Sequence, residues 1–445
     1  MRGLFISLLA SAQAFRAPAR PLRQTRSSAA AVDDDEECVV AVQAAIPPNY
    51  GEESRAFRRT VFRGPADWVE HRSDGRIINN LRSTFASGVV RSLRYEVSLV
   101  AGVAVLVAVW NGIGAAQLDP TGIHIVPENV HLSHLSLPAM PHALSSPALA
   151  LLLVFRTNVS YARWLEARSL WGRIINNSRG IVRTLAAWYP AHLKDDPEQM
   201  RKVARVARLT ASFSRTAQLT LQRTIVDETC FSQEAFADSL MARTNLGLKQ
   251  SEADFIAGST PNRPLAALAE LSQAVYDATE SLPFSDRKLT DVDARVVELG
   301  DCLGACERIY GTPVPLVYTR HTARFLAVWL LLVPLALAGS LDSHASFVDS
   351  LSIIPESAVI ATFLFGIDEL AVQLEEPFSI LALEAMADGI DAALVQLLRP
   401  RPANLMSTDQ LSRPQAPPAA ATVNGEPAVA ASGGNPFASS PPWLK

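Results

Sequence analysis

The sequence has few cysteines and few charged residues, and each scarcity excludes a class of protein. It holds 4 cysteines in 445 residues, which is too few for a disulfide framework in a chain of this length. Charged residues make up 19% of the chain and hydrophobic residues 49%, while the formal net charge is only -4. This balance provides no strongly basic surface for nucleic acid and favours a protein with membrane segments. We therefore expect membrane lipid, and no nucleic acid, among its partners.

The motifs of common enzyme classes are absent as well. The sequence has no H-E-x-x-H, no phosphate-binding G-x-x-x-x-G-K-[ST] and no G-x-S-x-G. Cys302 and Cys306 are four residues apart on an expected helix, which is not the spacing of a zinc knuckle. We therefore predict no catalytic residue, no metal site and no cofactor, and a redox role for the two thiols stays open. A membrane enzyme and a purely structural membrane protein are the alternatives.

Two long stretches contain no lysine or arginine, and they locate the expected membrane spans. One lies between Arg94 and Arg156 and the other between Arg324 and Arg399. Apolar runs within them predict four membrane helices, at residues 97–113, 148–155 with a water-exposed continuation, 325–341 and 353–367. Arginines flank these spans on one side only, so the positive-inside rule places both termini and the middle of the chain on that side.

The other segments complete an all-α prediction. Residues 117–147, with five prolines and four histidines, predict a loop, whereas the strongly basic residues 55–94 predict short amphipathic helices on or near the membrane. Residues 180–320 show apolar residues at helical spacing and predict a soluble helical segment, in which Thr290 and Asp293 form a capping box. The expected fold is a four-transmembrane-helix membrane protein with this helical segment on the arginine-rich side.

The two ends of the chain have compositions that predict no fold. Residues 1–37 begin with a short apolar run and a small-residue cleavage site, followed by a segment rich in arginine, serine and alanine. A signal peptide followed at once by transit-peptide chemistry resembles the bipartite plastid targeting segment of algae with complex plastids. Residues 38–66 are expected to be a flexible mature N-terminus, and residues 401–445, rich in proline, alanine and serine, a disordered tail.

The rest of the chain is organised around residues 155–179, which read FRTNVSYARWLEARSLWGRIINNSR. This stretch begins where an apolar run ends, and it turns abruptly basic and aromatic. No proline interrupts it, so one helix can leave a membrane near Phe155 and continue into water. Leu151 and Phe155 are four residues apart and therefore share a face of this helix.

The amino-acid sequence of this stretch resembles the most characteristic segment of the bestrophin-like anion channel family. CERIYGTPVPLVYTRHTARFL, residues 306–326, resembles the beginning of that family's third membrane helix, and GIDELAVQLEEPFSILALE, residues 366–384, resembles the segment after its fourth. The resemblance covers about residues 67–400, which form one expected channel domain, and it is strongest to the voltage-dependent chloride channels of plant and algal thylakoids.

The resemblance implies a passive anion channel that assembles as a homopentamer, with five second helices around a central pore. Leu151 and Phe155 would then form apolar rings at the pore neck, a constriction able to gate by dewetting. Arg156 would either attract anions or pair with an acid of a neighbouring subunit. The expected membrane is that of the thylakoid, with another plastid membrane as the alternative. Chloride is the expected ion; bicarbonate, which would feed a carbon-concentrating system, nitrate, and a cation conductance are alternatives.

Calcium dependence is not expected. Animal members of the family carry a dense acidic run, which clasps calcium, soon after their equivalent of Glu376-Pro377-Phe378. The residues that follow here offer no carboxylate before Glu384, and calcium needs six to eight oxygen ligands. The nearby acids are expected to form a solvated acidic helix face made of Asp368, Glu369, Glu375 and Glu376.

Histidines are concentrated in the two loops, residues 114–147 and 342–352, on the side without arginines; in a thylakoid this side is the lumen and the arginine-rich side the stroma. Those loops contain no lysine or arginine but hold His124, His131, His134, His142 and His344. Histidine gains its proton near pH 6.5, within the range that an acidifying lumen crosses. The first four are therefore pH-sensing candidates whose protonation would favour anions at the pore entrance, while neutral polar filling of a loop is the alternative.

Overall fold

The computed structural model describes residues 65–84, 87–116, 134–189, 196–222, 232–280, 285–341 and 347–399, and the described elements belong to one compact unit, Met1–Leu398. Some predictions concern residues outside these ranges: the targeting segment, most of the N-terminal segment 38–66, the tail 401–445, His124, His131 and His344.

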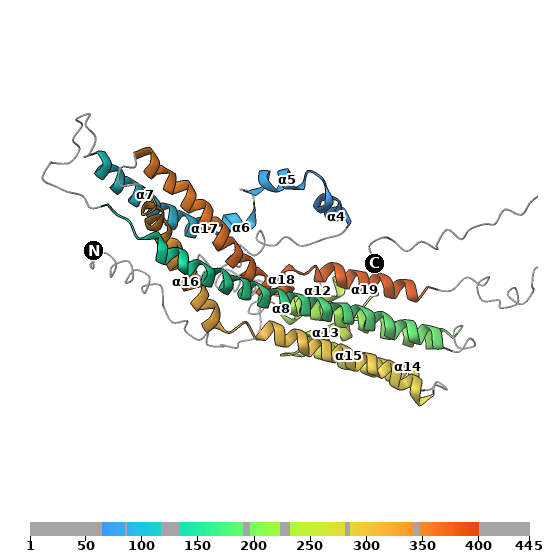
Figure 1. Cartoon of the computed structure of the whole chain (residues 1–445). Helices are drawn as coiled ribbons and strands as arrows, with labels where there is room; N and C mark the ends of the chain where they lie inside the picture. Colours follow the sequence, from blue (N-terminus) through green and yellow to red (C-terminus); the bar gives the residue numbers. More distant parts are fainter. Residues whose placement is uncertain are drawn as a thin grey trace, which may run out of the picture. The chain divides into compact units, whose positions relative to one another are not determined.

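All regular elements of the described residues are helices, which confirms the all-α class (Figure 1). In chain order they are α4 (Pro65–Arg72), α5 (Arg76–Arg82), α6 (Gly88–Ser92), α7 (Arg94–Ala116), α8 (Ala139–Trp188), α10 (Pro197–Gln222), α12 (Gln233–Arg243), α13 (Gln250–Gly258), α14 (Arg263–Thr279), α15 (Asp286–Gly311), α16 (Leu316–Ala338), α17 (Phe347–Glu375), α18 (Pro377–Ile380) and α19 (Leu383–Leu397).

Among the described residues, four helices are long and apolar enough to cross a membrane, as predicted. They are α7, α8, α16 and α17. α17 packs on α7 and α8, and α16 packs on the other three. Small residues such as Ala104 and Ala361 are fully buried in this bundle, which lets the helix backbones approach closely. Leu149 and Leu153 anchor the first part of α8 in the same bundle.

The second membrane helix begins nine residues earlier than predicted, so the predicted loop 117–147 is wrong for residues 139–147. Pro147 lies inside α8 and cannot donate a backbone hydrogen bond to the carbonyl of Ala143. The hydroxyl of Ser146 donates to that carbonyl instead, at 2.8 Å. Because this side chain satisfies the freed backbone group, the helix continues through the proline.

Other helix boundaries also differ from the prediction, and α7 extends the predicted span 97–113 by three residues at each end. α16 begins at Leu316 and α17 at Phe347, so both start before the predicted spans, and prolines lie inside both helices. α15 begins at Asp286 after Ser285, so Thr290 is not an N-cap; its hydroxyl donates to the carbonyl of Asp286 at 2.8 Å. The apolar runs mark the membrane-crossing part of a helix, and the polar turns that extend each helix carry no such signal.

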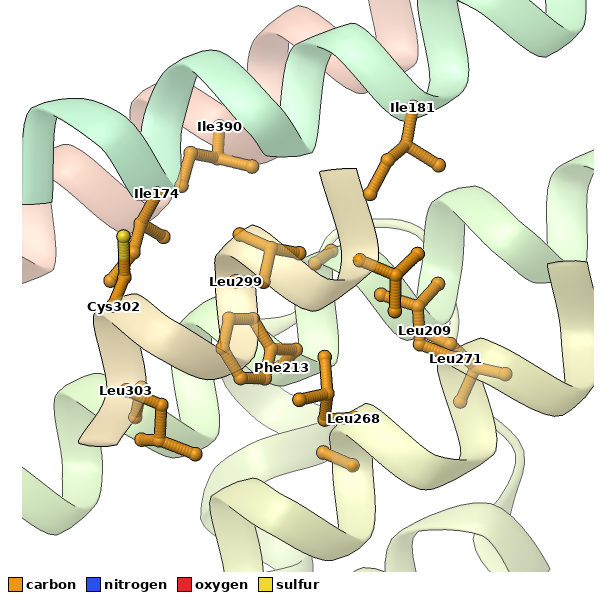
Figure 2. Packing of buried hydrophobic residues seen from close by; sticks show 14 of the residues in the cluster. Ile174, Ile181, Leu209, Phe213, Leu268, Leu271, Leu299, Cys302, Leu303 and Ile390 are labelled. Carbon is orange, nitrogen blue, oxygen red and sulfur yellow. The ribbon is translucent and has the colours of Figure 1, made fainter. Parts of the chain in front are cut away.

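A second and larger core lies outside the membrane bundle. We call it the helical body, and it comprises residues 167–185 of α8 with α10, α12, α13, α14, α15, α18 and α19. Ile174 and Ile181 of α8 face α15 and α10, and Phe213 lies against Leu299 and Leu268 (Figure 2). α8 therefore belongs to both cores, and it is the element that connects the membrane bundle to the helical body (Figure 1).

The chain segment just before α8, residues 134–138, is held between two membrane helices. The side-chain amide of Asn111 on α7 accepts a hydrogen bond from the backbone N–H of Leu135 at 2.8 Å and donates one to its carbonyl at 3.0 Å. The N–H of Leu137 donates to the carbonyl of Leu335 on α16 at 2.9 Å. At Gly339 the backbones are so close that a Cβ atom would collide with the Leu137 carbonyl oxygen. The beginning of the pore-helix candidate is thus fixed by backbone contacts.

Candidate functional site

One face of α8 remains uncovered by the chain's own helices. Leu151 and Phe155 lie on it and are 54% and 53% exposed, although both are large apolar side chains. The opposite face is buried, through Leu149, Leu153 and Ser160 among others. The structure therefore places the two neck candidates side by side on a free surface, where another molecule or another copy of the chain can cover them.

The same face continues into the helical body with a different composition. With 3.6 residues per turn, the exposed residues that follow Leu151 within about 40° of one line along the helix are Phe155, Asn158, Ala162, Leu165, Ser169, Arg173, Asn176, Arg183 and Ala187. The surface thus changes from apolar near Phe155 to polar and basic at its far end. Arg183 has no ion-pair partner among the described residues, so its positive charge is presented on this face.

Arg156 does not lie on that face, and the anion-attracting role predicted for it stays a prediction. The residue is only 5% exposed and forms an ion pair with Asp368 on α17 of its own chain. A buried arginine needs a counter-charge, because an unpaired charge in an apolar environment is costly. Arg156 therefore has an acidic partner within its own chain, and Asp368 is not part of a fully solvated acidic face.

Arg163, which the sequence interpretation missed, connects three helices. Its guanidinium donates to the carbonyl of Ile309 at 2.7 Å, to that of Thr312 at 2.9 Å and to that of Glu375 at 3.3 Å. These carbonyls belong to the C-terminal ends of α15 and α17, where backbone acceptors lack partners within the helix and carry partial negative charge. The Glu375 carboxylate in turn accepts a hydrogen bond from the N–H of Val314 at 2.9 Å.

The two described histidine candidates differ in their surroundings. His134 is exposed and lies before α8. His142 is not a loop residue, since it lies in α8 and its ring stacks on Trp329 of α16 with centroids 4.0 Å apart. The Trp329 ring N–H also donates to the Ser145 hydroxyl at 3.1 Å, which holds the ring in place. His142 is therefore a packing residue between two membrane helices.

Cys302 and Cys306 are buried thiols of the helical body. Neither forms a disulfide, and Cys302 lies beside Ile174 in the core (Figure 2). Burial raises the pKa of Cys306 to about 12 and also raises that of Cys302, so neither side chain is a thiolate at neutral pH. Both behave as small apolar core residues, and their surroundings provide no basis for redox reactivity.

Comparisons with known proteins agree with this geometry. A family model described as Bacterial/Fungal Bestrophin protein matches residues 67–396. Over 332 residues the chain is 29% identical to the Arabidopsis thaliana protein named voltage-dependent chloride channel 1, chloroplastic, covering 75% of this chain and 72% of that protein. It is 26% identical over 321 residues to a voltage-dependent anion channel-forming protein of Synechocystis, covering 72% and 91%.

The fold has a solved counterpart as well. The crystal structure of a bacterial bestrophin homolog from Klebsiella pneumoniae is similar with a TM-score of 0.54 at 25% sequence identity. The match covers 70% of this chain and 100% of that one. Because the family model spans most of the chain, including all four candidate membrane helices, this protein belongs to the bestrophin family.

Proposed function

We propose that this chain is a passive anion channel and that it assembles as a homopentamer, with the exposed face of α8 from each copy lining a central pore. The observation that carries the proposal is the exposure of Leu151 and Phe155, half uncovered on a helix whose other face is buried. One such helix cannot enclose a pore, whereas a ring of copies can. Apolar rings at a constriction can gate by dewetting.

The character of the surfaces supports the same arrangement. Large apolar residues are also exposed on the other spans, such as Leu106 on α7 at 69% and Phe363 on α17 at 71%, where membrane lipid is a suitable cover. The α8 face also continues into polar residues and carries an exposed arginine, Arg183, toward its far end. A basic surface beyond the neck would raise the local concentration of anions.

We place the channel in a plastid membrane, with the thylakoid as the first choice. The targeting chemistry of residues 1–37 supports this location, and so does the chloroplastic relative of Arabidopsis. Chloride is the proposed ion because that relative is named a chloride channel. Bicarbonate and nitrate are alternative ions, and a bicarbonate route would supply carbon fixation from the lumen.

Reconstitution in calcium-free planar bilayers should give anion currents. Two of the four nearby acids, those that precede Glu376, are already engaged, because Asp368 pairs with Arg156 and Glu375 accepts from Val314. Too few oxygens then remain for a calcium site of six to eight ligands. The reversal potential under a potassium chloride gradient should approach the chloride equilibrium potential, and added calcium should leave the current unchanged. Cation-selective currents, or currents that require micromolar calcium, would contradict the proposal.

Acidifying the lumenal bath should increase the anion conductance, but by less than the full number of histidines would give. Stepping from about pH 7.5 to about pH 5.5 protonates exposed imidazoles, while screening over about 8 Å restricts the effect to those near the pore entrance. Gln at His124, His131 and His134 together should remove the increase. His142→Gln is the matched control and should keep it, because that ring is packed on Trp329. A conductance independent of pH in the wild-type protein would refute this role.

A further inference from the structure

Two arginines of α8 contact α17 at two positions along the helices, and both contacts have the same sequence separation. Arg156 pairs with the carboxylate of Asp368, and Arg163 donates to the backbone carbonyl of Glu375. Both contacts join residues 212 apart in sequence. Within each helix the two residues are seven apart, which is two helical turns, so α8 and α17 run side by side in the same direction. The two contacts together fix the rotation of α8 about its axis and its position along that axis, relative to α17.

The first contact lies directly behind the neck candidates. Arg156 is the next residue after Phe155, and successive residues of an α-helix point about 100° apart. Keeping the buried Arg156 on Asp368 therefore determines the direction in which Phe155 points. Rotating α8 to turn Phe155 elsewhere would separate this pair and leave two uncompensated charges at low exposure.

The second contact fixes the position of α8 along its axis, at the boundary between the membrane bundle and the helical body. Arg163 binds carbonyls from the ends of α15 and α17, as described above. Each of the three acceptors is bound by a different nitrogen of the guanidinium, whereas a lysine ammonium carries all its donors on one nitrogen. Arg156 has one acidic partner, so a lysine can replace its charge there.

We propose that Arg156 and Arg163 are positioning residues of the channel: Arg156 sets which face of α8 is turned outward at the neck, and Arg163 fixes α8 against the ends of α15 and α17. This inference rests on the proposed function, in which the outward face of α8 lines the pore. Neither arginine touches the permeating ion, and both act through the orientation of Leu151 and Phe155.

The test measures how fast a charged thiol reagent in the bath blocks single channels of the full-length protein. One cysteine is introduced at the exposed position, Phe155→Cys, or at the half-buried flank, Leu152→Cys. Cys38 and Cys230 are changed to serine in all variants, because the two other native thiols are buried. A rate per channel does not depend on how much protein folds, so it reports orientation and not yield.

The wild-type background should be blocked faster at position 155 than at position 152. Arg156→Gln should abolish that preference and Arg156→Lys should keep it. Arg163→Lys should abolish it as Arg163→Gln does, since an ammonium carries its donors on one nitrogen and cannot replace donors on Nε, Nη1 and Nη2. Arg168→Gln is the matched control, an exposed arginine of the same helix without an ion pair among the described residues, and it should leave the preference intact.

The double variant Arg156→Asp, Asp368→Arg reverses the ion pair and is used in case Arg156→Gln forms no channels. It should restore the faster block at position 155. A preference retained in Arg156→Gln, lost in Arg156→Lys, or not recovered by the double variant overturns the inference. The failure of the proposed function looks different: the wild-type background would then carry no anion current, or position 155 would not be blocked at all.

Discussion

Changing Leu151 and Phe155 together to alanine should increase the mean current per channel by about tenfold, the factor that about 1.4 kcal/mol makes in an equilibrium. Each copy would lose an isopropyl group and a phenyl ring from the proposed pore neck. A wider constriction with less apolar surface fills with water more readily, and its closed, dewetted state becomes less favourable. Single-channel recording in bilayers measures both the conductance and the open probability.

The chain offers a matched control of the same residue types. Leu106 on α7 and Phe363 on α17 are exposed at 69% and 71%, and the proposal assigns both to lipid. Their double alanine variant should leave the current unchanged. An equal increase in both double variants would indicate a general loosening of the bundle, and an unchanged current in the α8 variant would show that its residues only pack.

Adding a single methyl group at Gly339 should destabilise the assembled protein by about 3 kcal/mol, through overpacking and the loss of a backbone hydrogen bond. Gly339 ends α16 with φ -72°, so alanine is allowed there by its backbone. The new Cβ atom would collide with the carbonyl oxygen of Leu137. Moving that carbonyl away also disturbs the hydrogen bond from Leu137 to Leu335, which holds the segment before α8.

Gly102→Ala on α7 is the control for this substitution. A Cβ atom at Gly102 meets no atom within 4 Å, so alanine should be neutral or slightly stabilising through its higher helix propensity. The thermal midpoint of the detergent-solubilised protein measures both variants. If Gly339→Ala melts at the wild-type temperature, the approach of the two backbones is not a constraint on stability.

The hydrophobic pattern allowed the four spans and the all-α class to be predicted, because long apolar runs without charged residues are typical of membrane helices. The beginning of α8 could not be found in this way, since Pro147 is a helix breaker unless a neighbouring hydroxyl replaces its missing donor. That substitution by Ser146 is a local contact that hydropathy does not report. The same limit explains the early beginning of α17, which contains Pro355.

The candidate site was predictable where it depends on local periodicity and not where it depends on distant partners. Spacing within one helix was enough to put Leu151 and Phe155 on one face. The partner of Arg156 lies 212 residues away, and nothing in one sequence identifies it. The contact of Arg163 could not be found from residue types either, because its acceptor on α17 is the backbone carbonyl of Glu375, which any residue would offer.

The length of α8 gives the molecule a lever. At 1.5 Å per residue its 50 residues extend about 75 Å, and Arg163 divides that length unequally. Phe155 is eight residues from Arg163 and Trp188 is 25, which correspond to arms of about 12 and 37 Å. A tilt of α8 about Arg163 therefore moves its far end about three times as far as it moves Phe155. A large displacement of the helical body is reduced to a small one at Phe155, and the force applied there is multiplied by the same ratio.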